Sequence, residues 1–127
     1  MAPTDVVRAT WEEFTAGMRP GELELVESFR ALVMALDAVE ERVSRTEVSF
    51  ARRRLFAGAF TRSGRLEVFI DLLRQASHPL TIAVFPTTKQ VWTHRLTIER
   101  PDQLDGTIRE LIDEAYATVG PGVPRAR

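Results

Sequence analysis

The spacing of apolar residues changes along the chain from helical to alternating and back to helical. Over residues 22–39 they recur every three or four positions, which predicts an amphipathic helix. The members of this apolar face are Leu25, Phe29, Leu32, Val33 and Leu36. A thinner apolar pattern over residues 5–18, with Thr4 or Asp5 as N-cap, predicts a shorter helix before it. The chain therefore starts with two helices.

Three strands are predicted next, because the apolar period changes to two from residue 43 onward. They cover residues 43–50, 55–61 and 65–73. The pair Ser63-Gly64 suits a tight turn between the second and the third strand, whereas the segment between the first two contains no Gly, Asn or Pro. The three strands should follow one another as an antiparallel meander.

The last third of the chain predicts two further strands and a helix. Residues 80–85 are bounded by Pro79 and Pro86, which favours a short strand at a sheet edge, with a loop as the alternative. Alternation returns over residues 90–99. An apolar stripe over residues 101–119 then predicts a helix that ends at the following Gly-Pro pair.

This order of elements predicts an α+β fold, in which an antiparallel sheet of four to five strands has the N-terminal and C-terminal helices packed on one face. The expected limits are an N-terminal helical extension over residues 1–21, a single α+β domain over 22–120 and a disordered tail over 121–127. The matching apolar faces predict one core that contains Phe29, Leu32, Phe56, Val68, Trp92, Leu96, Ile108 and Leu111.

Composition narrows the class of protein further. The 127 residues contain 44% hydrophobic side chains and no cysteine, which favours a reducing compartment and excludes disulfides and thiolate metal sites. The N-terminus lacks the apolar run of a signal peptide, and no stretch of the sequence is apolar for long enough to form a transmembrane helix. We expect a cytoplasmic protein that makes no membrane contact.

The net charge of −1 hides a separation of charges along the chain. Residues 1–41 carry three arginines and nine acidic residues, whereas residues 42–65 carry seven arginines and one acidic residue, Glu47. A basic segment of this kind can bind phosphates, but the acidic helices should pack nearby and cancel much of its field. We therefore expect no strong binding to nucleic acid.

The common motifs for catalysis and cofactor binding are absent from the sequence, including Gly-rich phosphate loops, paired-His metal helices and nucleophile elbows. Only His78 and His94 supply imidazoles, so three histidines cannot bind one metal within a chain. Glu47 and Asp71 alternate with apolar residues and are expected to face water rather than act as paired carboxylates. The sequence predicts no catalytic residue, no metal and no cofactor.

Five residues form the candidate ligand site. Arg45, Arg52 and Arg54 can bind phosphate or carboxylate through bidentate hydrogen bonds, or they form a solvated edge that keeps strands from pairing with other chains. Trp92 and His94 share the apolar face of the strand predicted over 90–99. His94 is either a ligand contact or acid-base group in a partly apolar pocket, or a buried histidine that is hydrogen-bonded to a neighbour.

Several short segments resemble a known bacterial family. They are residues 45–58, Arg65-Leu66, the Val-Trp-Thr-His-Arg run at 91–95, Leu104-Asp105 and residues 114–116. Together they make residues 22–119 similar to the domain-of-unknown-function family numbered 5655, some relatives of which are labelled as predicted transport proteins. The resemblance implies the family's fold and domain limits, and it implies no reaction.

The leading expectation is a non-catalytic binding or interaction module. In it, a groove between the sheet and the helices takes a small anionic ligand or a protein partner. The first alternative is a nucleic-acid accessory domain that uses the arginine-rich hairpin, and the second is an enzyme of unknown type. A homodimer is also compatible with the sequence.

Overall fold

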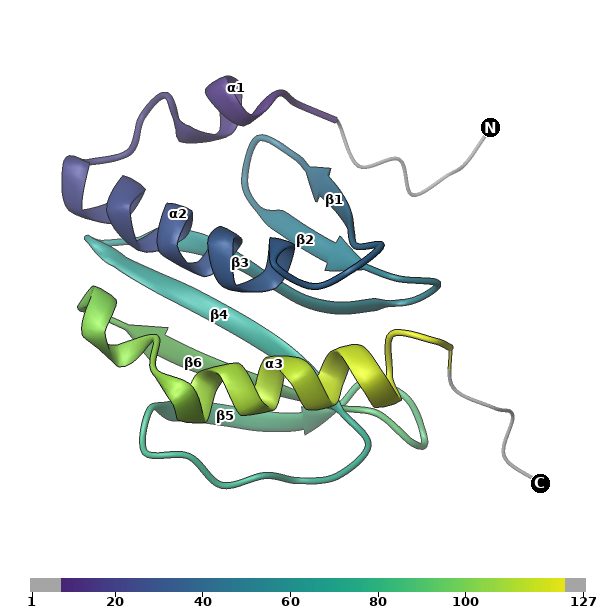
Figure 1. Ribbon diagram of the computed structural model, residues 1–127. Coiled ribbons are helices and arrows are strands. Elements are labelled where there is room, and N and C mark those ends of the chain that lie inside the picture. The colour runs from purple at the N-terminus through teal and green to yellow at the C-terminus, as the bar shows by residue number, and fades with distance from the viewer. Residues whose placement is uncertain (1–7, 123–127) are drawn as a thin grey trace.

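Residues 8–122 are described by the computed structural model, in which three α-helices and a six-stranded antiparallel sheet form an α+β fold (Figure 1). The helices are α1 (Trp11–Thr15), α2 (Pro20–Met34) and α3 (Gly106–Thr118), with a short 3-10 helix, η1 (Pro101–Gln103), before α3. The strands are β1 (Glu40–Val43), β2 (Val48–Ala51), β3 (Leu55–Arg62), β4 (Arg65–Leu72), β5 (Thr81–Pro86) and β6 (Trp92–Ile98). They lie in the order β1-β2-β3-β4-β6-β5.

The sheet has six strands rather than four or five, because the segment predicted as one strand over 43–50 contains a turn. The Ser44 backbone N–H donates to the Glu47 carbonyl at 2.9 Å, and the Ser44 hydroxyl accepts from the backbone N–H groups of Thr46 and Glu47. This turn joins β1 to β2, so the meander starts one strand earlier than predicted. The alternating sequence runs through the turn without a Gly or Pro to mark it.

Each helix is shorter than the sequence predicts. Helix α1 begins at Trp11, where Thr10 forms a capping box with Glu13, and the predicted start near Asp5 lies outside the described residues. Helix α2 ends at Met34, four residues before Ala38 adopts a left-handed φ of 56°. Pro101 belongs to η1 instead of α3, which begins after its N-cap Asp105. Most of the tail predicted over 121–127 also lies outside the described residues.

Helices α2 and α3 both lie across the same face of the sheet, over β3 and β4 (Figure 1). The core fills the space between them and the sheet, and Phe29 of α2 meets Phe50 of β2 there with ring centroids 6.0 Å apart. Of the eight predicted core residues, Leu32 and Trp92 are only half buried and the other six are buried. Phe14 of α1 belongs to the same core, so the helix predicted as an extension packs with the rest.

A β-bulge in β3 decides which side chains reach the core. Phe50 pairs with Ala57 and Ala51 pairs with Leu55, so Phe56 is an extra residue in β3. The extra residue turns Phe56 toward the helices, where its ring packs edge-on against Tyr116 of α3 at 5.8 Å. Leu55 is left on the opposite face of the sheet, where it lines the hollow described below.

Candidate functional site

The face of the sheet that points away from α2 and α3 carries the candidate site. The strand register places five of its residues in one row across the sheet, from β1 to β6: Arg42, Ser49, Gly58, Phe69 and Arg95. Within residues 8–122 the buried apolar side chains of the helices all belong to the core on the other side. We call this surface the helix-free face.

Two carboxylates on β4 are buried on the helix-free face and are held by their neighbours. Asp71, which is 4% exposed, accepts hydrogen bonds from the Thr93 hydroxyl at 2.7 Å and from Arg54 at 3.3 Å. Glu67 accepts from the Thr97 hydroxyl at 2.9 Å and from Arg95 at 3.4 Å. Each buried charge therefore has an opposite charge and a hydroxyl beside it, as stable burial requires.

Phe69 packs closely against the backbone of β3. A Cβ atom on Gly58 would lie 2.1 Å from the Phe69 Cζ atom, so the ring occupies the space that any larger residue at position 58 would need. Beyond Gly58 the same row continues with the small residue Ser49 on β2. Because Gly58 has no side chain and Ser49 has a small one, the surface over β2 and β3 is recessed between Phe69 and the edge strand β1.

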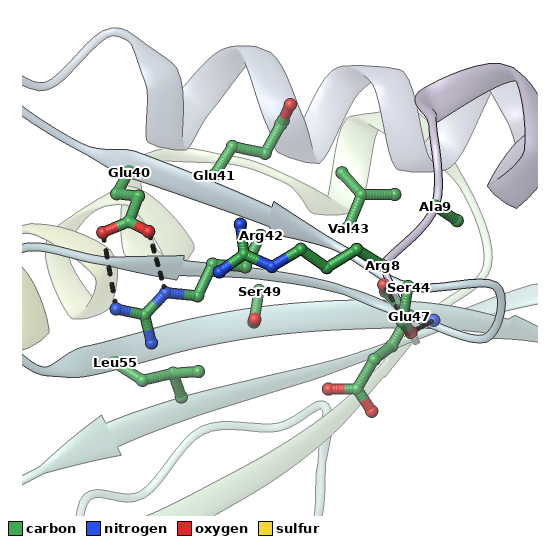
Figure 2. A pocket seen from close by; sticks show the side chains of 10 residues that line it. All are labelled: Arg8, Ala9, Glu40, Glu41, Arg42, Val43, Ser44, Glu47, Ser49 and Leu55. Atoms are coloured by element: carbon green, nitrogen blue, oxygen red, sulfur yellow. Dashed lines mark hydrogen bonds and ion pairs between the residues drawn. The ribbon is translucent and has the colours of Figure 1, made fainter. Parts of the chain in front are cut away.

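A hollow of about 560 Å³ lies over the β1–β2 hairpin and the start of β3. Figure 2 shows the side chains around it, with Arg42 and Leu55 on one side of Ser49 and Glu47 on the other. The full lining is Arg8, Ala9, Glu40, Glu41, Arg42, Val43, Ser44, Glu47, Ser49 and Leu55. We call this site the hairpin hollow.

Arg8 reaches the hairpin hollow because the segment before α1 runs beside the edge strand. The Ala9 N–H donates to the Val43 carbonyl at 3.0 Å, and Arg8 forms an isolated antiparallel bridge with Ser44. This contact covers the end of β1 and extends the Arg8 side chain toward Arg42 (Figure 2). The segment before α1 thus supplies one of the two cations at the site.

The hairpin hollow is lined by two arginines and three glutamates, and not all of these charges are paired. Arg42 donates to both carboxylate oxygens of Glu40, at 3.2 and 3.4 Å. These hydrogen bonds hold the pKa of the Glu40 carboxyl below its ordinary value, and the nearby charge of Arg8 acts in the same direction. Arg8 and Glu47, in contrast, form no ion pair with any of the residues that the structure describes.

Ser49 is the most unusual group at this site. It is only 7% exposed, and its hydroxyl forms no hydrogen bond with residues 8–122. The hydroxyl points into the hairpin hollow (Figure 2), and its oxygen is not among the fully buried side-chain atoms. A nearly buried hydroxyl normally forms hydrogen bonds to protein or to ordered water. This one is available to a molecule that occupies the hollow.

His94, a predicted site residue, lies in the core on the helix side of the sheet and is 1% exposed. Its Nε2 atom accepts a hydrogen bond from the Ala76 N–H at 2.8 Å. Its Nδ1 atom lies 3.1 Å from the Trp92 carbonyl, which requires the proton to be on Nδ1. Both ring nitrogens are thus used by the backbone, as in the buried alternative considered for this histidine.

The other four predicted site residues lie in separate places. Arg45 is in the β1–β2 turn, 3.7 Å from Glu13. Arg52 lies over the ring of Tyr116, with 4.2 Å from its guanidinium carbon to the ring centroid. Arg54 binds Asp71 on the helix-free face, and Trp92 is half buried at the start of β6. The structure therefore forms no common groove from these residues and His94.

His78, the second histidine, helps to anchor the start of α3. Its Nδ1 atom accepts from the Leu80 N–H at 3.1 Å, and its Nε2 atom lies 2.8 Å from the Thr107 hydroxyl. That hydroxyl donates to Asp105 at 2.6 Å, so the histidine is not placed to accept its proton. Among residues 8–122 no three His, Asp or Glu side chains are grouped closely enough to hold a metal ion.

Sequence reasoning missed the residues that do come together. Asp71 was expected to face water, yet it is buried, because Arg54 and Thr93 lie on either side of it. Ser49 carried a usable signal, since it alternates with the core residues Val48 and Phe50. That signal places Ser49 on the opposite face of the sheet, but only the fold shows that this face lacks a helix.

Comparison with known protein families shows where the chain belongs. The family model described as "Domain of unknown function (DUF5655)" matches residues 12–119. No curated protein and no solved structure matches the chain. Because the family match covers most of the 127 residues, the chain belongs to the DUF5655 family.

Proposed function

We propose that the protein is a non-catalytic binding module that holds a small ligand in the hairpin hollow through an anionic group of that ligand. The observation that carries this proposal is the hydroxyl of Ser49, which lies nearly buried at the site and forms no hydrogen bond within residues 8–122. Arg8 and Arg42 line the same hollow and provide guanidinium donors for a carboxylate or a phosphate.

The size of the hairpin hollow supports a small ligand. Its volume of about 560 Å³ is within the range of small-molecule sites, roughly 300–1,000 Å³. The two histidines support a non-catalytic role, because the ring nitrogens of both are engaged inside the fold. The proposal therefore keeps the predicted class of function and moves the site to the hairpin hollow. The residues predicted for the site were Arg45, Arg52, Arg54, Trp92 and His94.

A thermal-unfolding series with small anions tests the proposal. Citrate, phosphate and acetate are compared with sodium chloride at matched ionic strength, because a bound ligand at 100 times its Kd adds about 2.7 kcal/mol to the free energy of unfolding. We expect at least one of the anions to raise the Tm above the chloride control. Arg8→Ala and Arg42→Ala should remove the rise.

Arg109→Ala is the matched control, because Arg109 is exposed on α3 and forms no ion pair within residues 8–122. It should retain the full rise in Tm. A rise that is lost equally in all three arginine variants would mean that net charge, rather than the hairpin hollow, controls the response. The proposal also fails if no anion exceeds the chloride control.

A protein partner at β5 is a second candidate, and one observation favours it. Ile82 is 59% exposed and Phe85 is 42% exposed, although both are large apolar residues on a strand at the edge of the sheet. The simplest such partner is a second copy of the chain. Sedimentation of the protein over a concentration series tests this case, and Phe85→Asp should reduce any dimer observed.

A further inference from the structure

The hairpin hollow contains an unpaired charge of each sign. Arg8 and Glu47 both line it, and neither forms an ion pair with the described residues. A site made for a simple anion would have no use for the Glu47 carboxylate, which would repel that anion. The Glu47 carboxylate therefore constrains which chemical group the ligand has in addition to its anionic group.

The register of the hairpin places these charges around Ser49. Arg42 is directly opposite Ser49 on β1, where paired Cβ atoms are about 4.5–5.5 Å apart. Glu47 precedes Ser49 by two residues, which corresponds to about 7 Å along a strand. A guanidinium and a carboxylate thus lie on different sides of one hydroxyl, within the span of a single small molecule.

We propose that the ligand is a small zwitterion of the α-amino-acid type, with its carboxylate bound by Arg8 and Arg42 and its ammonium bound by Glu47. This assignment rests on the proposed function, since it names the ligand of the same site. The Ser49 hydroxyl donates to the ligand carboxylate between the two charged groups. An α-amino acid carries its ammonium and its carboxylate on one carbon, so a single small molecule presents both charges to the residues that flank Ser49.

Leu55 provides an apolar surface beside these charged groups. It is half buried on β3, and the bulge at Phe56 directs it into the hairpin hollow. An aliphatic side chain of the ligand can pack against it and lose contact with water. The hairpin hollow leaves room for ligand side chains of different sizes. The ammonium and the carboxylate of the ligand are therefore the main determinants of recognition.

Matched probes separate the contributions of the two charges. Leucine is compared by titration calorimetry with 4-methylpentanoate, which lacks the ammonium, and with 3-methylbutylamine, which lacks the carboxylate. Aspartate and succinate form a second pair. We expect each amino acid to bind about 1.5- to 5-fold more tightly than its analogue without the ammonium, the range for one partly exposed ion pair.

Glu47→Gln tests the residue assigned to the ammonium. It should reduce the affinity for leucine to that for 4-methylpentanoate, while the affinity for 4-methylpentanoate stays the same or rises. Glu24→Gln is the control, because Glu24 is exposed on α2, and it should change neither affinity. Ser49→Ala should weaken leucine and 4-methylpentanoate alike. Urea denaturation of each variant without ligand verifies that it is folded.

The outcomes distinguish the two levels of the proposal. If 4-methylpentanoate and succinate bind as tightly as the amino acids, the zwitterion is wrong and the anion-binding function stands. If neither the amino acids nor the simple anions bind, the proposed function itself is wrong. If 3-methylbutylamine binds most tightly, the site selects cations and both are wrong.

Discussion

Buried polar residues of this protein form two groups at the level of single residues. Asp71, Glu67 and His94 each have hydrogen-bond partners within the fold, which offset the cost of removing them from water. Ser49 is buried to a similar extent but has no such partner in residues 8–122. Partnered groups stabilise the fold, whereas an unpartnered group that faces a hollow is available for binding. This difference is why the site is assigned to Ser49 and not to His94.

Gly58→Ala should destabilise the protein, because the new Cβ atom would overlap the Phe69 ring, with 2.1 Å to Cζ. We expect a loss of about 1–3 kcal/mol in the free energy of unfolding, as for other overpacked sites. In a Phe69→Ala background the same change should be neutral or stabilising, since Ala is favoured over Gly in a strand by about 0.5–1 kcal/mol. Urea denaturation of the four proteins measures both effects, and equal losses in both backgrounds would contradict the explanation.

Glu22 should contribute to acid denaturation. Its carboxylate accepts from the Arg19 N–H at 2.9 Å and from the Gly64 N–H at 2.8 Å, and the first of these bonds is the main cause of its lowered pKa. A pKa that is lower in the folded state gives stability above the unfolded value near 4.5, and that stability is lost as the pH falls.

Glu22→Gln removes this titration and keeps one side-chain oxygen. That oxygen can still accept one of the two hydrogen bonds that the carboxylate accepts. Between about pH 5 and pH 3 the free energy of unfolding should therefore fall less steeply in Glu22→Gln than in the wild type. Glu24→Gln, which changes an exposed residue of the same helix, should follow the wild type. A parallel fall in all three proteins would exclude Glu22 as a source of the acid sensitivity.

At the level of elements, the sequence predicts the type of most helices and strands correctly, but it places their ends at the wrong residues. The period of α2 is clear because its buried residues repeat at helical spacing. Strand β1 was missed because its sequence, Glu-Glu-Arg-Val, is charged and the following turn depends on the Ser44 hydroxyl rather than on Gly or Pro. The ends of helices and strands depend on single side-chain hydrogen bonds, and the spacing of apolar residues does not predict these bonds.

Helix α3 should depend on its buried face for its attachment to the sheet. Leu111 is 8% exposed and belongs to the core, so Leu111→Ala should lower the free energy of unfolding by about 2–5 kcal/mol. Glu110→Ala changes an exposed neighbour on the same helix and should alter it by less than about 0.5 kcal/mol. Denaturant melts measure both values. A loss below about 1 kcal/mol for Leu111→Ala would mean that α3 packs loosely.

For the whole molecule, the site was harder to predict than the fold because it depends on contacts between distant segments. The hairpin hollow combines Arg8, from the segment before α1, with residues of β1, β2 and the start of β3. The sequence indicated a cluster of arginines, but Arg45 and Arg52 lie in different surroundings, beside Glu13 and Tyr116. Which charges meet across a sheet is decided by strand order and register, and neither can be read from local spacing.

The distribution of ion pairs also determines the response to nucleic acid. Four of the seven arginines between residues 42 and 65 have a carboxylate within 4.0 Å. These pairs are Arg42–Glu40, Arg45–Glu13, Arg54–Asp71 and Arg65–Glu99. Exposed pairs of this kind add little stability, but each one cancels most of the field of its arginine beyond a few ångströms. The basic segment is therefore much closer to neutral when seen from solution, although Arg52, Arg53 and Arg62 have no carboxylate within 4.0 Å among residues 8–122.

Binding to mixed-sequence DNA or RNA should consequently be weaker than about 10 μM near 150 mM salt, within the non-specific range. Fluorescence anisotropy with labelled oligonucleotides over a salt series measures it. Three results together would contradict this neutral surface: submicromolar binding at that salt, a slope of about −3 or steeper in log K against log salt, and loss of binding when Arg52, Arg53 and Arg54 are changed to Ala. The arginine-rich hairpin would then have to present its guanidinium groups to phosphates in preference to the carboxylates that lie beside them in the folded chain.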